Sequence, residues 1–174
     1  GLAKQFNCEK RFILEQRMND LNARKMQKAD LGVVVSLLAD DELGRSREDK
    51  GEVVHADYLR AFEHIDSDVN QYAAIFEING ETIGCLQITF IPGLSRRGSL
   101  RGQIEGVRVS RDFRGKGYGA KMIAWAITKC RDRGCKMVQL TSDKKRENAI
   151  QFYEKLGFVQ SHHGLKLTLA PVLE

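Results

Sequence analysis

The chain has 174 residues, 42% of them hydrophobic, and a formal net charge of +5. This is the size of one domain, with enough apolar content for a core. No apolar run approaches the roughly 20 residues of a membrane span, and the first residues lack the apolar segment of a signal peptide. We therefore expect a soluble, cytoplasmic protein with no membrane partner. Residues 21–174 would form its single domain, after an extension or artificial leader over residues 1–20 in which Met18 could be the initiator.

The mild positive charge suits an anionic ligand, although a solvated surface of mixed charge explains most of it. Nucleic-acid binding would need a basic stripe interleaved with aromatic residues, and the run Lys144-Lys145-Arg146 is too short for that, so no nucleic-acid partner is expected. The cysteines form no C-x-x-C pair, which favours free thiols over disulfides or a zinc site, and no metal is expected. They are Cys8, Cys85, Cys130 and Cys135.

Two helices are expected in the first third of the domain. Apolar residues recur at helical spacing after Asp30, with a stop at Gly44, and a second helix covers about residues 56–65. The segment between them, residues 44–51, is charged. Residues 12–21 could also place an apolar face on a helix.

Strands follow these helices. Residues 71–77 alternate, Asn79-Gly80 is a hairpin signal, and residues 82–91 and 99–110 continue as strands. Four short strands are expected before the glycine turn. Further on, residues 137–141 read as a buried strand and residues 165–169 as a closing one.

A glycine-rich turn follows the strand that ends near Val109. Its sequence is Arg114-Gly115-Lys116-Gly117-Tyr118-Gly119, and a helix-periodic run follows it as far as Gly134. Ala120 and Met122 stand where G-x-G-x-x-G would need glycine, and the Ser or Thr of a Walker loop is missing after Lys116. Because the first N–H groups of a helix lack internal partners and glycine permits close approach, this turn is suited to bind phosphate oxygens.

In the helix after the turn, one face is apolar and is expected to pack into the core, while Trp125 is expected to pack rather than to bind a ligand. The residues of this face are Met122, Ile123, Ala126, Ile127 and Cys130.

A second compact element runs from Asn148 to Phe158, N-A-I-Q-F-Y-E-K-L-G-F. Asn148 with Gln151 has the spacing of a capping box, and Gly157 is placed to end the helix. The apolar residues Ala149, Phe152, Tyr153 and Leu156 are expected to form its buried face.

The two elements together resemble the GNAT superfamily of N-acetyltransferases, with its R/Q-x-x-G-x-G/A turn and its N-A-x-x-F-Y-E-K-x-G-F helix. The matched stretch covers about residues 104–158. The resemblance implies an α/β fold with a mixed, mostly antiparallel sheet of about six or seven strands flanked by about four helices. It also implies acetyl-coenzyme A as cosubstrate, bound at the turn through backbone amides.

The resemblance assigns roles to particular residues. Around Val107 and Val109, where the fourth and fifth strands separate, a backbone N–H would polarise the thioester carbonyl, and Asn148 would contact the pantetheine arm, although capping alone could explain that asparagine. Glu105, expected on the same face as Gln103, Val107 and Val109, would take the amine proton. Pairing of Glu105 with Arg101 or Arg108 is an equal alternative.

Tyr153 would protonate the leaving thiolate, with plain core packing as its alternative. The histidines lie outside both motifs and are expected at the surface; they are His55, His64, His162 and His163.

The function implied is transfer of acetyl from acetyl-coenzyme A to a primary amine of a small molecule, by direct attack in a ternary complex. A protein or peptide N-acetyltransferase and a non-catalytic acyl-coenzyme A binding module remain as alternatives. The acceptor and the oligomeric state, including a homodimer, stay open.

Overall fold

The structure is a computed structural model that describes residues 21–40, 42–45, 48, 51 and 54–169. The helical face expected within residues 12–21 therefore lies almost wholly outside the described residues, as does Cys8.

One mixed sheet forms the centre of the fold, with the strand order β1-β2-β3-β4-β5. Its strands are β1 (Asn22–Lys25), β2 (Gln71–Ile78), β3 (Glu81–Ile91), β4 (Arg101–Val109) and β5 (Met137–Leu140). The first four are antiparallel neighbours, and β5 lies parallel to β4. The expected α/β class and mostly antiparallel sheet are confirmed, but the sequence pattern did not indicate β1, which the structure places before the first helices.

The sheet has five strands in the described part of the chain, so the expected six or seven were too many. Residues 165–169 form no strand, and Leu165, Leu167 and Leu169 are 95%, 86% and 80% exposed. Their alternation specifies an apolar face, but it does not specify a partner edge, and a strand forms only with one.

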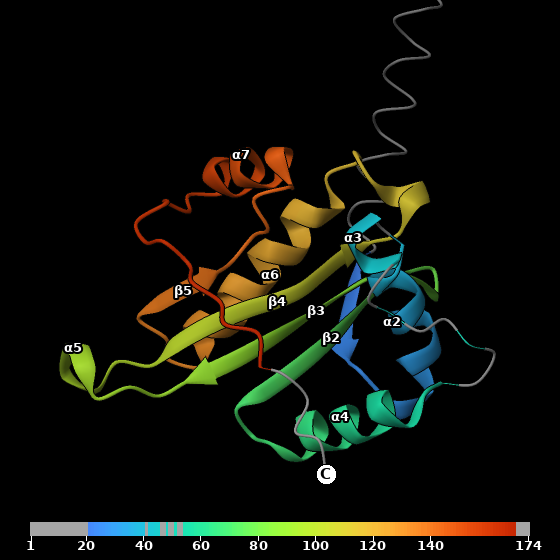
Figure 1. Cartoon of the computed structure of the whole chain (residues 1–174), viewed down its shortest axis with the longest axis horizontal. Helices are drawn as coiled ribbons and strands as arrows, with labels where there is room; N and C mark the ends of the chain where they lie inside the picture. The colour runs from blue at the N-terminus through green and yellow to red at the C-terminus, as the bar shows by residue number, and fades with distance from the viewer. Residues whose placement is uncertain (1–20, 41, 46–47, 49–50, 52–53, 170–174) are drawn as a thin grey trace, which may run out of the picture.

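Helices cover both faces of the sheet (Figure 1). They are α2 (Leu31–Leu38), α3 (Glu42–Arg45), α4 (Ala56–Ser67), the short α5 (Ser95–Gly98), α6 (Tyr118–Asp132) and α7 (Glu147–Lys155). Two 3-10 turns, η1 (Lys28–Asp30) and η2 (Arg111–Phe113), precede α2 and the glycine turn. The helix expected between Asp30 and Gly44 is divided, because α2 ends at Leu38 and Gly44 lies within α3. An aspartate such as Asp40 is unfavourable at the negative end of a helix, which favours this early stop.

Two apolar clusters hold these layers together. On one face α6 packs with Met122, Ile123, Ala126 and Cys130, all 0% exposed, so the expected core face of this helix is confirmed. Trp125 packs edge-on against Phe76 at 5.2 Å, as expected of a packing residue. The other face carries a second cluster under α2 and α4, which includes the following buried sheet residues: Ala73, Ile75 and Cys85.

β4 contains a β-bulge at Gly106. In the register with β3, Cys85 is opposite Arg108 and Gln87 is opposite Glu105, so both Gly106 and Val107 face one residue of β3. Gly106 has φ +60, a conformation that favours glycine. The extra residue reverses the alternation of side chains along the rest of the strand.

The bulge corrects one expectation. Gln103 and Glu105 share a face of β4, as expected, but Val107 and Val109 pack into the opposite cluster, under α6. The expectation assumed an unbroken period of two, which the bulge interrupts.

Candidate active site

β4 and β5 separate part-way along their length. Their pairing runs from Arg101 opposite Met137 to Ile104 opposite Leu140 and ends there, while β4 continues to Val109. From Glu105 onward, β4 therefore presents a backbone edge that β5 does not cover. Such an edge can bind an extended ligand through main-chain N–H and C=O groups.

The glycine turn lies at the end of this edge, at the start of α6. Gly115 and Gly117 have φ +72 and +85, and Gly117 is the N-cap residue of α6. No side chain caps the helix and its first turn holds no acidic residue. The first N–H groups of a 15-residue helix thus remain for an anion, and with the partial positive charge of the helix end they fit a pyrophosphate group.

The side chains of the turn contribute less than its backbone. Tyr118 is 5% exposed and packs on Phe113, with ring centroids 5.8 Å apart, so its backbone N–H is what it can offer a ligand. A β-carbon at Gly119 would come within 3.4 Å of the Phe152 ring, so α6 and α7 lie close here. Lys116 Nζ donates to the Asp112 carbonyl oxygen at 2.6 Å.

Arg114 connects the turn to the end of α2. Its Nε donates to the Val109 carbonyl oxygen at 2.9 Å, and its Nη2 donates to Asp40 Oδ2 at 2.9 Å. Arg111 Nη2 donates to the other carboxylate oxygen of Asp40 at 2.8 Å. A single carboxylate thus joins two arginines, and the pair keeps one net positive charge beside the turn.

Tyr153 lies on α7 between two aromatic rings, 5.1 Å from the Phe152 centroid and 5.8 Å from that of Phe158. Burial raises the pKa of its hydroxyl above the ordinary value, while the positive charges of Arg108 and Arg146 act in the opposite direction. The hydroxyl is therefore protonated at neutral pH. It has no hydrogen bond to any part of the chain that the structure describes.

The sequence predicted the C-terminal end of α7 correctly but not its N-terminal end. At the C-terminus, Gly157 has φ +92 and its N–H donates to the Glu154 carbonyl, while the Phe158 N–H donates to that of Tyr153. This is the Schellman motif that Gly157 indicated.

The expected N-terminus of α7 was wrong. The helix begins at Glu147, one residue before Asn148, and Asn148 is an exposed residue of its first turn instead of the N-cap. Asp143 forms a turn just before this earlier helix start, because its side chain accepts from the Lys145 N–H and its carbonyl oxygen accepts from the Arg146 N–H. Its exposure leaves the Asn148 side chain available to a ligand.

Glu105 is exposed on β4, on the face opposite α6, and lies opposite Gln87 of β3. Among the described residues it has no ion pair with Arg101 or Arg108, the alternative partners that the sequence left open. Arg108 instead donates from Nη1 to the Val107 carbonyl oxygen at 2.9 Å. The sequence did not single out Asp40, which belongs to no motif and meets Arg111 and Arg114 only through the fold.

Three thiols lie within the described chain, and all are free. Burial raises the pKa of Cys85 and of Cys130 to about 12, so both stay protonated at neutral pH. Because the thiolate is the nucleophile, these two groups are unsuited to carry an acetyl group. In the same part of the chain no group of three or more His, Cys, Asp or Glu residues could hold a metal.

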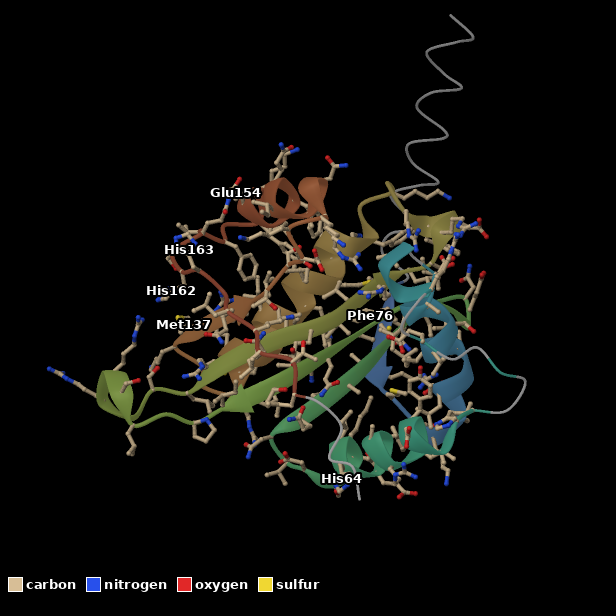
Figure 2. All side chains as sticks on the ribbon, in the orientation of Figure 1. His64, Phe76, Met137, Glu154, His162 and His163 are labelled. Carbon is tan, nitrogen blue, oxygen red and sulfur yellow. The ribbon has the colours of Figure 1, made fainter. Side chains whose placement is uncertain are left out.

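The histidines are exposed, as expected. In the view of Figure 2, His162 and His163 are seen toward the β5 side of the molecule and His64 on α4 below the sheet. None of the helices in the described ranges is long and apolar enough to cross a membrane.

The separated strands, the glycine turn and the α7 helix occur in the order of a known family. The sequence profile described as "Acetyltransferase (GNAT) family" matches residues 38–158. The chain belongs to this family. As a GNAT protein it is an acetyl-coenzyme A-dependent acyltransferase.

Similar proteins agree with this assignment. The chain is 29% identical over 157 residues to a glucosamine 6-phosphate N-acetyltransferase of Trypanosoma brucei brucei, covering 86% of this chain and 97% of that protein. It is 30% identical over 95 residues to an aminoalkylphosphonate N-acetyltransferase of Salmonella typhimurium, covering 55% of this chain and 61% of that protein. The crystal structure of a protein described as a transcriptional regulator from Bacillus halodurans C-125 has 43% identity and a TM-score of 0.83, covering 86% of this chain and 99% of that one.

Proposed function

We propose that this GNAT protein transfers acetyl from acetyl-coenzyme A to a primary amine of a small molecule, by direct attack in a ternary complex. The separation of β4 from β5, with the uncapped start of α6 at its end, is the observation that carries the proposal. The two N-acetyltransferases named above support it, because each is named for a small amine as its substrate.

The chain's own groups supply the steps. Backbone N–H groups of Gly115 to Ala120 bind the pyrophosphate, and the free edge of β4 near Val107 and Val109 holds the pantetheine arm and polarises the thioester carbonyl. When bound, acetyl-coenzyme A supplies the activated acetyl group. A preorganised backbone donor at the carbonyl contributes roughly 3 kcal/mol to catalysis.

Two side chains move protons in this proposal. An alkylamine has a pKa of roughly 10.4, so a base must remove a proton at neutral pH, and Glu105 on the exposed side of β4 is the candidate. The Tyr153 hydroxyl, which burial keeps protonated at neutral pH by raising its pKa, donates a proton to the departing thiolate. The protonated thiols of Cys85 and Cys130 favour direct attack over an acetylated cysteine.

A sensing role for the same acetyl-coenzyme A site is a second candidate. The similar Bacillus halodurans protein favours it, since that protein is described as a transcriptional regulator. Steady release of free thiol from acetyl-coenzyme A on adding amines supports turnover, whereas tight binding without release supports sensing.

The experiment pairs that thiol assay with a binding test of the turn. Gly117→Val should reduce coenzyme A affinity by at least about 100-fold, because a β-branched side chain is strained at positive φ and blocks close approach of the phosphates. Gly134→Val is the matched control, since Gly134 lies just past the other end of α6 with φ +86 and open space around it. Calorimetry should show loss of binding in the first variant alone. Equal affinities in both variants would refute the phosphate assignment.

A further inference from the structure

Polar side chains form a row across four neighbouring strands on the face of the sheet opposite α6. Gln71 is opposite Thr89, Thr89 opposite Gln103, and Gln103 opposite Gln139 in the register of the strands. We call these four residues the polar row. All four are half-buried.

The polar character of the row continues along β3 and β4. The next residue on this face of β2 is the buried Ala73, whereas those of β3 and β4 are Gln87 and Glu105. Sheet positions favour apolar and β-branched side chains, so glutamines on β2, β4 and β5, with Thr89 of β3 between the first two, are unusual for a surface that serves packing alone.

Hydrogen bonds within the row use some of its polar groups and leave others. Thr89 Oγ1 and Gln87 Nε2 both donate to Gln71 Oε1 at 2.9 Å, and Gln139 Nε2 donates to Gln103 Oε1 at 2.7 Å. The amide N–H groups of Gln71 and Gln103 and the Oε1 of Gln139 have no partner among the described residues, yet none is sealed from solvent. Donors and an acceptor in fixed positions thus remain free to bind a ligand.

The row lies next to the proposed site of proton transfer. Glu105 is two residues beyond Gln103 on the same face of β4, about 7 Å away at the rise of a strand. An acceptor whose amine meets Glu105 can extend over the row. Neighbouring strands are about 4.8 Å apart, a spacing similar to that of hydroxyl groups across a sugar ring.

We propose that the polar row binds hydroxyl groups of the acceptor, which makes the acceptor a polyhydroxylated amine of the amino-sugar class. This rests on the proposed acetyl transfer and specifies its substrate. The row carries no formal charge, so it matches hydroxyl groups, which both donate and accept hydrogen bonds. A site built to bind hydroxyl groups discriminates strongly against an analogue that lacks them, because its polar groups then lose their partners.

The test compares glucosamine with cyclohexylamine, which has the same ring size but no hydroxyl groups. The parent should favour glucosamine by at least about 100-fold in kcat/KM, measured as thiol release from acetyl-coenzyme A. Gln103→Leu and Gln139→Leu should each lower kcat/KM for glucosamine by at least about tenfold and leave that for cyclohexylamine within about twofold. Gln160→Leu is the matched control, because Gln160 bonds to Glu154 away from the sheet.

The outcomes separate this inference from the proposed function. A parent that acetylates cyclohexylamine as well as glucosamine retains the proposed function but overturns the role of the row, as do leucine variants that lower both rates equally. If no amine releases thiol, calorimetry of glucosamine binding in the presence of coenzyme A still decides about the row. Binding that Gln103→Leu weakens supports it, and no binding to the parent overturns it.

Discussion

The two halves of β4 have different strand neighbours. Residues 101–104 are paired with β3 on one side and with β5 on the other. Residues 105–109 are not paired with β5, and after the bulge at Gly106 their side chains alternate in the opposite sense. The first half carries Gln103 between its two paired neighbours, and the second has a backbone edge that β5 does not cover, where the Val107 and Val109 carbonyl oxygens accept from Arg108 and Arg114. One inserted residue and one early end of pairing thus suffice to give a single strand a fully paired part and a part with an open edge, the two places where we propose that acceptor and cofactor bind.

The largest effect on turnover should come from replacing Tyr153, the proposed proton donor to the thiolate. Tyr153→Phe keeps the ring between Phe152 and Phe158 and removes the proton donor, so turnover should fall by about 10² to 10⁴ while the melting temperature and coenzyme A affinity barely move. Steady-state thiol release, calorimetry and thermal unfolding measure the three quantities. Tyr72→Phe is the control, since Tyr72 also packs on an aromatic ring, 5.7 Å from that of Trp125. If turnover of Tyr153→Phe stays within twofold of the parent, the hydroxyl is not the proton donor and Tyr153 only packs in the core.

Glu105 is the first residue of β4 after its pairing with β5 ends. Its replacement should have a smaller effect on the rate, and this effect should depend on pH. Glu105→Gln should lower the rate about 10- to 100-fold at pH 7, and the loss should shrink as the pH approaches 10, because the amine is then neutral without a base. The ratio of mutant to parent rates from pH 6 to 10 is the measurement, with Glu81→Gln at the exposed start of β3 as control. A flat ratio would contradict the role of Glu105 and favour a chain of water molecules.

The smallest effect on cofactor binding should come from replacing Asp40, which lies just after α2 and pairs with Arg111 and Arg114. Asp40→Asn removes the charge that Arg111 and Arg114 share, so coenzyme A affinity should rise about two- to threefold as the arginines lose their neutralising partner. The melting temperature should fall by only about 2 °C, since both arginines of these ion pairs are exposed. Asp57→Asn, in the exposed pair with Arg60 on α4, is the control for calorimetry and melting. A fall in affinity would mean that Asp40 must hold Arg114 in place for the turn to bind phosphate.

The sequence predicted the parts of this molecule that depend on local chemistry. The glycines of the turn and Gly157 require particular backbone conformations, and the apolar spacing of α6 allows only one buried face, so these features were read correctly.

Predictions from the sequence were wrong where the local conformation depends on residues outside the motif itself. The bulge at Gly106 depends on how β3 pairs with β4, and the start of α7 depends on the turn around Asp143. The polar row could not have been found from spacing, because its four residues come from four strands and become neighbours only through the sheet register.

The unpaired edge of β4 also bears on how quickly a ligand can be captured. From Glu105 to Val109 no hydrogen-bonded ladder to β5 has to be broken before an extended molecule takes its place. Association of an extended ligand therefore does not have to wait for β5 to detach from this part of β4. Differences in affinity among cofactor analogues should then reside mainly in how long each stays bound.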